Sequence, residues 1–221
     1  IWASCMVSCG DADGAVTGNT RRYGSSLEKI TKVVDSRPGE IMFGLNMIVN
    51  KGKTVFVGDT SVHEYPSSEQ LADIAISSAR VVRLFGFDPK IAFVSHSTFG
   101  QPLTSRTKHI KNAVNILKEK NVDFKFDGDM QPDVALDEEY KSLYPFSKIV
   151  GNANVLIMPA LHSAAISTKL MKVFGGGKNI GPLLIGLGQP IEVAPLRAST
   201  SEILNLASIA AYSSDVIDYS N

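Results

Sequence analysis

Cationic side chains lie beside two predicted helices of this 221-residue chain. Arg21 and Arg22 shortly precede a predicted helix at 25–34, and Lys169 lies within another at 164–174. Helix N-terminal amides and guanidinium groups both favour phosphate. We therefore expect Arg21, Arg22 and Lys169 to bind an anion such as a phosphate. The alternative is that the two arginines are solvated surface charges.

Hydroxyl groups mark a second candidate site, in the loop 95–100 that follows a predicted strand at 90–94. Ligands of parallel sheets bind at the carboxyl ends of the strands, where hydroxyls suit phosphate or carbonyl oxygens. Ser97 and Thr98 are therefore candidate ligand-binding residues. The alternative is a Ser/Thr turn that caps the next element.

Carboxylates are dense in the segment 127–133, which we expect to be a loop after a strand at 123–126. Asp127, Asp129 and Asp133 could bind a metal, but no His or Cys is interleaved and acidic loops are commonly solvated. The four histidines have no ligand spacing, and the chain contains no P-loop and no G-x-S-x-G motif. The sequence therefore predicts no metal site.

Lys169 would be positioned by a helix that lies between two apolar strands. Ile166, Leu170, Val173 and Phe174 share one face of this helix. A strand, a loop, a helix, a glycine stop and a second strand follow one another, which is typical of a right-handed crossover in a largely parallel sheet. These elements are predicted at 155–158, 160–163, 164–174, 175–177 and 182–187.

Strands and helices alternate along the rest of the chain, which predicts an α/β fold. Two strands joined by the turn Asn50–Lys53 predict a hairpin that gives the sheet an antiparallel edge. Ser199 and Glu202 fit a capping box, which is a local role for Glu202. The other strands are predicted at 15–17, 41–49, 54–58, 90–94, 123–126 and 191–193, and the other helices at 3–8, 25–34, 66–84, 105–120, 136–143 and 199–211.

The composition is that of an ordinary globular domain. Lys and Arg total 22 and Asp and Glu total 22, so the formal net charge is zero, which argues against nucleic-acid or anionic-membrane binding. No apolar run is long enough to span a bilayer. Cys5 and Cys9, which lie in or next to a predicted helix, are expected to be reduced thiols of a cytoplasmic protein. A chain that begins at Ile1 is expected to be a fragment of a longer polypeptide.

Several ordered motifs resemble those of phosphotransacetylases, the phosphate acetyl- and butyryltransferase family. The motifs are DADGAVTG, RPG, GDTSV, IAFVSHSTFG, DGDMQPDVAL, ANVLIMP and IGPLLIGLGQP. The stretches TRRYGSSLEKI, YPFSKIVG and LHSAAISTKLM more narrowly resemble the phosphotransacetylase-like domain at the C-terminus of bacterial malic enzymes.

The resemblance implies a two-domain α/β/α fold with mostly parallel mixed sheets, similar to that of isocitrate and isopropylmalate dehydrogenases. Residues 1–38 and 190–221 would belong to a first domain whose N-terminal portion is missing, and residues 39–189 to a second domain. The resemblance also implies a homo-oligomer, at least a dimer formed through the second domain.

Members of this family move an acetyl group between acetyl phosphate and coenzyme A. By resemblance, their helix lysine corresponds to Lys169 and the aspartate that takes the thiol proton corresponds to Glu202. Their Ser-Arg pair falls on Pro195 and Leu196, with Arg197 displaced by one position. Because proline has no hydroxyl, we expect acetyl transfer to be lost. Glu202 and Arg197 are the remaining catalytic candidates.

Two further correspondences also suggest that acetyl transfer is lost. The asparagine ahead of the helix lysine corresponds to Ala165, and the phosphate-binding arginine of the early helix corresponds to Glu28, whose charge would repel an acyl phosphate. The resemblance therefore implies a regulatory and oligomerisation domain of an NADP-dependent malic enzyme, which oxidatively decarboxylates malate to pyruvate. Acetyl-CoA would be its allosteric effector. NADP and a divalent metal, Mg or Mn, would bind to an N-terminal malic enzyme domain of the same chain.

Two other functions stay open at this point. One is an active phosphate acetyltransferase, in which Arg197 and Glu202 take over the missing roles. The other is a purely structural assembly domain that binds no ligand.

Overall fold

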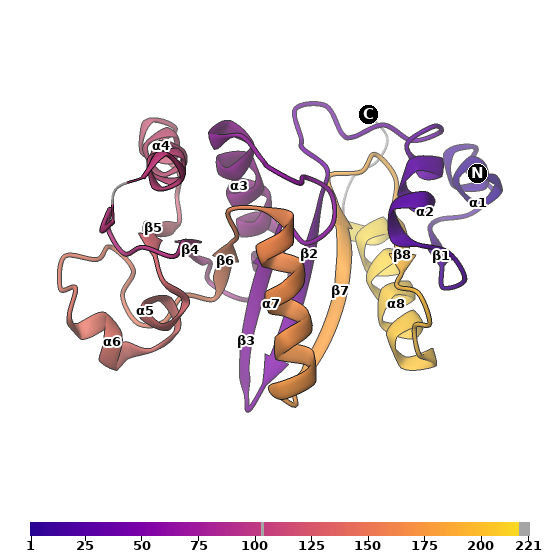
Figure 1. Cartoon of the computed structure of the whole chain (residues 1–221). Coiled ribbons are helices and arrows are strands. Elements are labelled where there is room, and N and C mark those ends of the chain that lie inside the picture. Colours follow the sequence, from indigo (N-terminus) through magenta and orange to yellow (C-terminus); the bar gives the residue numbers. More distant parts are fainter. Residues whose placement is uncertain (103, 217–221) are drawn as a thin grey trace.

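The computed structural model describes residues 1–102 and 104–216, which form an α/β fold (Figure 1). The helices of this part are α1 (Trp2–Ser8), α2 (Tyr23–Ile30), α3 (Ser68–Leu84), α4 (Ser105–Glu119), α5 (Pro132–Leu136), α6 (Glu138–Ser142), α7 (Leu161–Phe174) and α8 (Thr200–Val216). The strands are β1 (Ala15–Gly18), β2 (Phe43–Asn50), β3 (Lys53–Gly58), β4 (Lys90–Val94), β5 (Lys125–Met130), β6 (Val155–Ile157), β7 (Lys178–Ile185) and β8 (Ile191–Ala194). None of these helices is both long and apolar enough to cross a bilayer.

Two sheets organise the strands. The smaller sheet pairs β1 and β8 in parallel, with Ala15 opposite Ile191. The larger sheet has the order β5-β4-β6-β3-β2-β7. Its first four strands run parallel, whereas β2 is antiparallel to both β3 and β7. The larger sheet is therefore mixed, as predicted.

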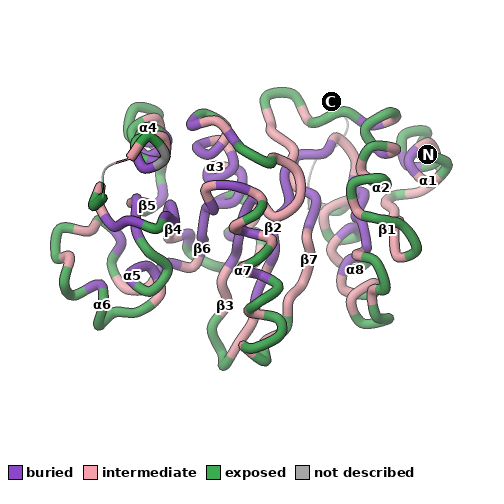
Figure 2. The backbone as a smooth tube through the Cα atoms, in the orientation of Figure 1, coloured by how far each residue is buried: buried purple, intermediate pink, exposed green. Residues whose placement is uncertain are grey.

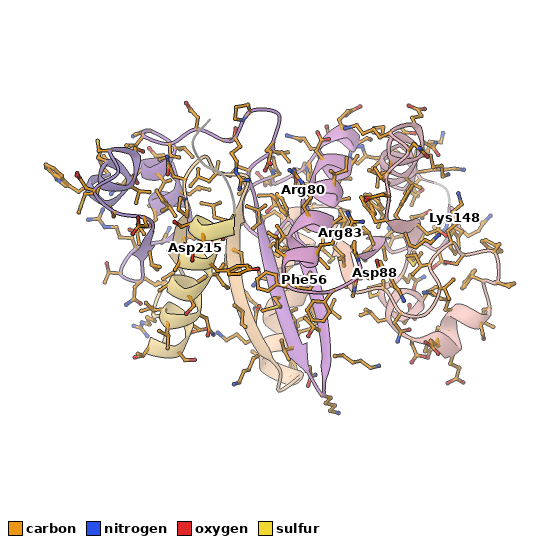
Figure 3. All side chains as sticks on the ribbon, turned by 180° about the vertical axis from the view of Figure 1, so that it is seen from behind. Phe56, Arg80, Arg83, Asp88, Lys148 and Asp215 are labelled. Atoms are coloured by element: carbon orange, nitrogen blue, oxygen red, sulfur yellow. The ribbon has the colours of Figure 1, made fainter. Side chains whose placement is uncertain are left out.

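Helices cover both faces of the larger sheet. α3 and α4 pack on the face that contains Phe56, and α5 and α7 pack on the face that contains Val57. These two neighbouring residues serve different cores because successive side chains of a strand point to opposite faces. Figure 1 shows α7 in front of the sheet, and Figure 3, seen from behind, shows α3 with Arg80 and Arg83 on the other side.

The predicted hairpin of β2 and β3 is confirmed, but it does not form the edge of the sheet. β2 pairs with β3 on one side and with β7 on the other, so β7 is the edge strand. β7 begins at Lys178, earlier than predicted, and includes Pro182, a residue that edge strands tolerate. As a result, α7 connects two strands, β6 and β7, that are separated in the sheet by β3 and β2.

The acidic segment was predicted to be a loop, and this prediction is wrong. Strand β5 extends through Asp127 and Asp129. The carboxylate of Asp129 accepts hydrogen bonds from the Ser97 hydroxyl and, at 2.9 Å, from the Gly100 N–H. Asp127 accepts one from the Lys148 N–H at 2.7 Å. These partners allow both carboxylates to be buried in a strand. Across the described residues, no group of three His, Cys, Asp or Glu side chains is arranged to hold a metal ion.

The two sheets draw their strands from different parts of the chain. The smaller sheet pairs an early segment of the chain, Ala15–Gly18, with a late one, Ile191–Ala194. The strands of the larger sheet lie between Phe43 and Ile185. The division into domains at residues 39 and 189 stays a prediction.

The apolar residues on one face of α7 are exposed to solvent, and Figure 2 shows exposed stretches along this helix. Ile166, Leu170, Val173 and Phe174 are 58, 52, 74 and 84% exposed. The opposite face packs on the sheet through Ala164 and Met171.

Candidate functional site

A cleft of about 550 Å³ is lined by elements of both sheets and their helices. The start of α2, the loop after β8 and the start of α8 form one side. The loop after β3, parts of β2 and β7, and residues of α7 from Leu161 to Lys172 form the other. The charged and polar residues that line it are Arg22, Tyr23, Asn46, Thr60, Ser61, Thr168, Lys169, Lys172, Asn179 and Glu202.

Two cations of the cleft have no ion-pair partner among the described side chains. They are Arg22, the N-cap residue of α2, and Lys169 of α7. Lys172, one turn further along α7, pairs with Glu202 of α8 at 2.9 Å and so joins the two sides of the cleft. A guanidinium and an ammonium group that are not neutralised by carboxylates favour the binding of an anion.

Amide and hydroxyl groups line the same cleft. Asn46 of β2 donates a hydrogen bond from its side-chain amide to the Oδ1 atom of Asn179 of β7 at 2.8 Å. The hydroxyls of Tyr23 and Ser61 are buried without a hydrogen-bond partner of good geometry in the described part of the chain. Burial raises the pKa of Tyr23 well above its usual range, although the nearby Ser61 hydroxyl opposes this effect. The Tyr23 hydroxyl therefore keeps its proton.

The loop after β3 is held in place by Asp59, whose side chain is only 1% exposed. Its carboxylate accepts hydrogen bonds from the N–H groups of Gly44 (2.9 Å), Ser61 (2.8 Å), Val62 (3.1 Å) and His63 (2.7 Å), and from the His63 ring at 2.9 Å. Burial alone would raise the pKa of Asp59, but these hydrogen bonds outweigh it and lower the pKa. A charged anchor thus fixes the loop that lines the cleft.

Glu202 is the carboxylate of the cleft. Its Oε2 atom accepts hydrogen bonds from the N–H of Ser199 at 2.8 Å and from the Ser199 hydroxyl at 2.9 Å, and its own N–H donates to that hydroxyl at 3.2 Å. The predicted capping box is confirmed. The Ser199 N–H and the Lys172 ammonium are the main causes that lower the pKa of Glu202 to about 2. Such a carboxylate is a weak base and is poorly suited to remove a thiol proton near neutral pH.

Two of the predicted anion-binding residues, Arg22 and Lys169, come together in the cleft. Arg21 is exposed and is not among the residues that line it. Its role as an anion ligand stays a prediction.

Ser97 and Thr98 lie away from the cleft, in the loop after β4, and are 0 and 6% exposed. The Ser97 hydroxyl donates to Asp129, and the Thr98 hydroxyl accepts a hydrogen bond from the Gln131 N–H at 3.3 Å. Both hydroxyls therefore have partners inside the protein. Ligand binding by these two residues stays a prediction.

Most positions that the resemblance relates to catalysis line the cleft. They are Ala165, Lys169, Pro195, Leu196 and Glu202. Arg197 is not among the lining residues; its φ is 60° and its N–H donates to the Asn19 carbonyl at 3.0 Å. Glu28 is also outside the lining and forms an exposed ion pair with Lys32 at 3.1 Å. The catalytic role of Arg197 stays a prediction.

The sequence interpretation did not include Tyr23, Asn46 or Asn179 as site residues. Asn46 is buried between apolar residues in the middle of β2, and a polar residue in such a position needs a partner. That signal could have identified it. Tyr23 carries no comparable signal, because only the folded chain places α2 beside the loop after β3.

The cleft combines the groups needed to bind an anion that is attached to an apolar body. Arg22 and Lys169 supply positive charge. Thr60 and Ser61, which also line the cleft, supply hydroxyl groups. Leucine, proline and alanine side chains supply apolar contact area; they are Leu161, Ala165, Pro182, Pro195 and Leu196. The described lining offers binding groups rather than a hydroxyl paired with a base.

The fold and the cleft define the class of protein, that of phosphotransacetylase-like α/β proteins. The crystal structure of a phosphotransacetylase from Streptococcus pyogenes is similar to this chain with a TM-score of 0.89 and 28% sequence identity, covering 97% of this chain and 66% of that one. The family model described as phosphate acetyl/butaryl transferase matches residues 1–211. The chain therefore belongs to the phosphate acetyl/butaryl transferase family.

Two kinds of relatives are similar to the chain. An NADP-dependent malic enzyme of Rhizobium meliloti is 46% identical over 211 residues, which are 96% of this chain and 28% of that protein. A phosphate acetyltransferase of Clostridium acetobutylicum is 34% identical over 218 residues, with 94% of this chain and 65% of that protein covered. The chain thus spans less than a third of the malic enzyme that it matches. It is similar to the C-terminal region of NADP-dependent malic enzymes.

Proposed function

We propose that this chain is the regulatory and oligomerisation domain of an NADP-dependent malic enzyme and that the cleft binds acetyl-CoA as an allosteric effector. The proposal is supported by Arg22 and Lys169, the two cations without ion-pair partners in the described lining of the cleft. The phosphates of coenzyme A carry the negative charge that these cations attract. The apolar lining offers contact to the acyl end.

Loss of acetyl transfer is part of this proposal. A phosphotransacetylase needs a base for the thiol of coenzyme A and donors for the charge that develops on the acetyl group. Glu202, with a pKa of about 2, is a weak base, and Pro195 stands where the resemblance places a hydroxyl donor. Binding without turnover is what this combination favours.

The whole protein would use residues outside this chain for its chemistry. We assign NADP and a divalent metal to an N-terminal malic enzyme domain of the same polypeptide, and we place the protein in the cytoplasm. Support comes from the similarity to a malic enzyme of which this chain spans 28%.

An active phosphate acetyltransferase is the second candidate, and the 34% identity to a phosphate acetyltransferase favours it. The test is an assay of the intact protein with acetyl phosphate and coenzyme A. Our proposal predicts no turnover above the level of a Lys169→Ala variant. Turnover that Lys169→Ala abolishes would instead establish the acetyltransferase.

Lys169→Ala is expected to weaken acetyl-CoA binding by about 1–2 kcal/mol, roughly five- to thirtyfold in Kd, because one charge-assisted interaction is lost. Isothermal titration calorimetry of the intact protein measures this effect. Lys111→Ala, which removes an exposed lysine of α4 far along the chain from the cleft lining, is the matched control and should bind like the wild type. Equal affinities in all three proteins would remove Lys169 from the site.

We further propose that a homo-oligomer, at least a dimer, forms through the apolar face of α7. Ile166, Leu170, Val173 and Phe174 form an exposed apolar row, and exposed apolar patches of this kind mark association surfaces. A second copy of the chain presents the same row, so two such faces can cover each other. A purely structural assembly domain would share this property but would bind no acetyl-CoA.

Phe174→Glu is expected to shift the intact protein toward smaller species by at least tenfold in the dissociation constant, because a charge would be buried in the contact. Analytical ultracentrifugation over a range of concentrations measures the shift. Leu204→Glu places the same charge on α8, at a leucine that is also exposed. That control should leave the oligomer unchanged. Identical behaviour of both variants would exclude α7 as the contact.

A further inference from the structure

A second cavity, of about 410 Å³, lies at the carboxyl ends of β4 and β6. These strands are neighbours in the larger sheet. The helix after β4 packs on one face of the sheet, and the helix after β6 packs on the other. Loops that leave neighbouring strands toward opposite faces open a crevice between them, and open α/β sheets bind ligands there. The second cavity therefore lies where open α/β sheets commonly bind ligands.

This crevice is separate from the cleft described above. β6 lies between β4 and β3 in the sheet. The cleft is lined by the loop after β3, with Thr60 and Ser61, whereas the second cavity is lined by the loop after β4, with Ser95 and His96. The start of α7 contributes different residues to each. The two lining sets share no described residue.

The inner part of the second cavity is apolar. Val94, Ile110, Met158 and Ala160 line it, and all four are buried. Apolar side chains around an open space of this size favour the entry of an apolar group, since its contact with water is removed.

The outer part of the second cavity carries imidazole and phenol groups. His96, His162 and Tyr65 line it and are exposed. The rings of Tyr65 and His162 lie 5.7 Å apart between centroids. No Asp or Glu is among the described lining residues. The imidazole groups can donate hydrogen bonds to an anion.

A third imidazole, that of His109, has a different role. Its Nε2 atom lies 2.8 Å from the Pro66 carbonyl, and its Nδ1 atom lies 2.9 Å from the Ser68 hydroxyl. Since a carbonyl only accepts, Nε2 carries a proton and donates. Both ring nitrogens of His109 are therefore engaged, and the ring forms part of the wall.

We propose that this cavity is a second small-molecule site, for an organic anion with an apolar body. The acyl chain or aromatic ring of the ligand enters the apolar part lined by Met158 and Ile110. Its carboxylate or phosphate stays at the exposed part and accepts hydrogen bonds from His96 and His162. The inference does not depend on acetyl-CoA binding in the cleft.

The test uses octanoate and 2-naphthoate as probes of the intact protein, with ligand-observed NMR as the readout of saturable binding. The stronger binder distinguishes a chain from a ring as the apolar body. The uncharged 2-naphthamide should bind at least tenfold more weakly than 2-naphthoate. A double substitution, His96→Leu with His162→Leu, should weaken both anions roughly tenfold, because two hydrogen-bond donors are lost.

Two further variants locate the bound probe. Met158→Trp should abolish binding, because the larger side chain fills the apolar part of the cavity. Lys169→Ala should leave probe binding unchanged even where it weakens acetyl-CoA binding in the cleft. No saturable binding of either anion to the wild type, or equal binding by the double histidine variant, would overturn the proposal. The histidine variant decides the matter if Met158→Trp fails to fold, since both histidines are exposed.

Discussion

Replacing Asp59 with alanine is expected to lower the free energy of unfolding of the intact protein by about 3–5 kcal/mol. The buried carboxylate accepts hydrogen bonds from four backbone N–H groups and from the His63 ring. Without it, the N–H groups of Gly44 and Ser61 lose their charged partner, and the cleft-lining loop after β3 loses its anchor. Chemical denaturation at pH 7 measures the change.

The pH dependence of this effect follows from the lowered pKa of Asp59. A carboxyl group whose pKa is lower in the folded state stabilises the fold above its unfolded pKa, and the stabilisation is lost as the pH falls through the folded pKa. The difference between wild type and Asp59→Ala should therefore be full at neutral pH and shrink below the usual value of 3.8. A difference that grows on acidification would contradict the anchor.

The control for Asp59 is Asp73→Ala. Asp73 lies on α3 and forms an exposed ion pair with Lys120 at 2.8 Å. Exposed ion pairs contribute at most about 1 kcal/mol. Equal destabilisation by the two substitutions would mean that the buried hydrogen bonds of Asp59 contribute no more to the free energy of unfolding than an exposed ion pair does.

Glu192→Gln is expected to stabilise the protein at pH 8 by about 3 kcal/mol. Glu192 of β8 is buried, and its Oε2 atom accepts a hydrogen bond from the Leu184 N–H of β7 at 2.9 Å, which links the two sheets. Burial raises the pKa of Glu192 to about 8 from the usual 4.5, although the Leu184 N–H opposes this effect. Glutamine keeps an acceptor for that N–H and cannot ionise.

The pH dependence of stability that Glu192 causes has the opposite sign to that of Asp59. Between pH 4.5 and about 8 the unfolded chain has lost the Glu192 proton and the folded chain has kept it, so stability falls as the pH rises. The gain from Glu192→Gln should therefore be small near pH 4.5 and largest at pH 8. Thermal unfolding of the intact protein across this pH range measures it.

Glu119→Gln is the matched control for Glu192, because Glu119 is an exposed residue at the end of α4. It should have the same small effect at every pH. A stabilisation by Glu192→Gln that does not change with pH would contradict a raised pKa in the folded protein.

Local patterns were enough to predict most of the helices and strands. The strand Lys90–Val94 was predicted with its observed bounds, because the turn before it and the polar loop after it are both unambiguous in the sequence. The capping box of Ser199 and Glu202 is a contact between near neighbours and was predicted for the same reason.

Local sequence patterns did not predict which strands pair with each other in the sheet. β7 lies at the edge because it pairs with β2 over a separation of more than a hundred residues, and no local pattern specifies that partner. The apolar row of α7 illustrates a second limit. Helical spacing identified the row, but the face that meets the sheet is the opposite one, which contains Ala164 and Met171.

The candidate site was predicted in part. Arg22 was singled out because it precedes a predicted helix, and Lys169 because it is a cation on a helix that follows a buried strand. Both line the cleft. Asp127 and Asp129 were assigned to a loop, because their buried partners, such as the Gly100 N–H, lie far along the chain. Long-range hydrogen bonds of this kind are what the sequence alone leaves unresolved.

A calorimetric titration of acetyl-CoA into the intact protein, with malate oxidation followed in parallel, tests most directly whether the cleft is an effector site. We expect saturable binding, a loss of malate turnover over the same concentrations, and a Kd that is weakened in Lys169→Ala but not in Lys111→Ala. Absence of binding, or binding that leaves malate oxidation unchanged, would contradict the proposed regulatory function.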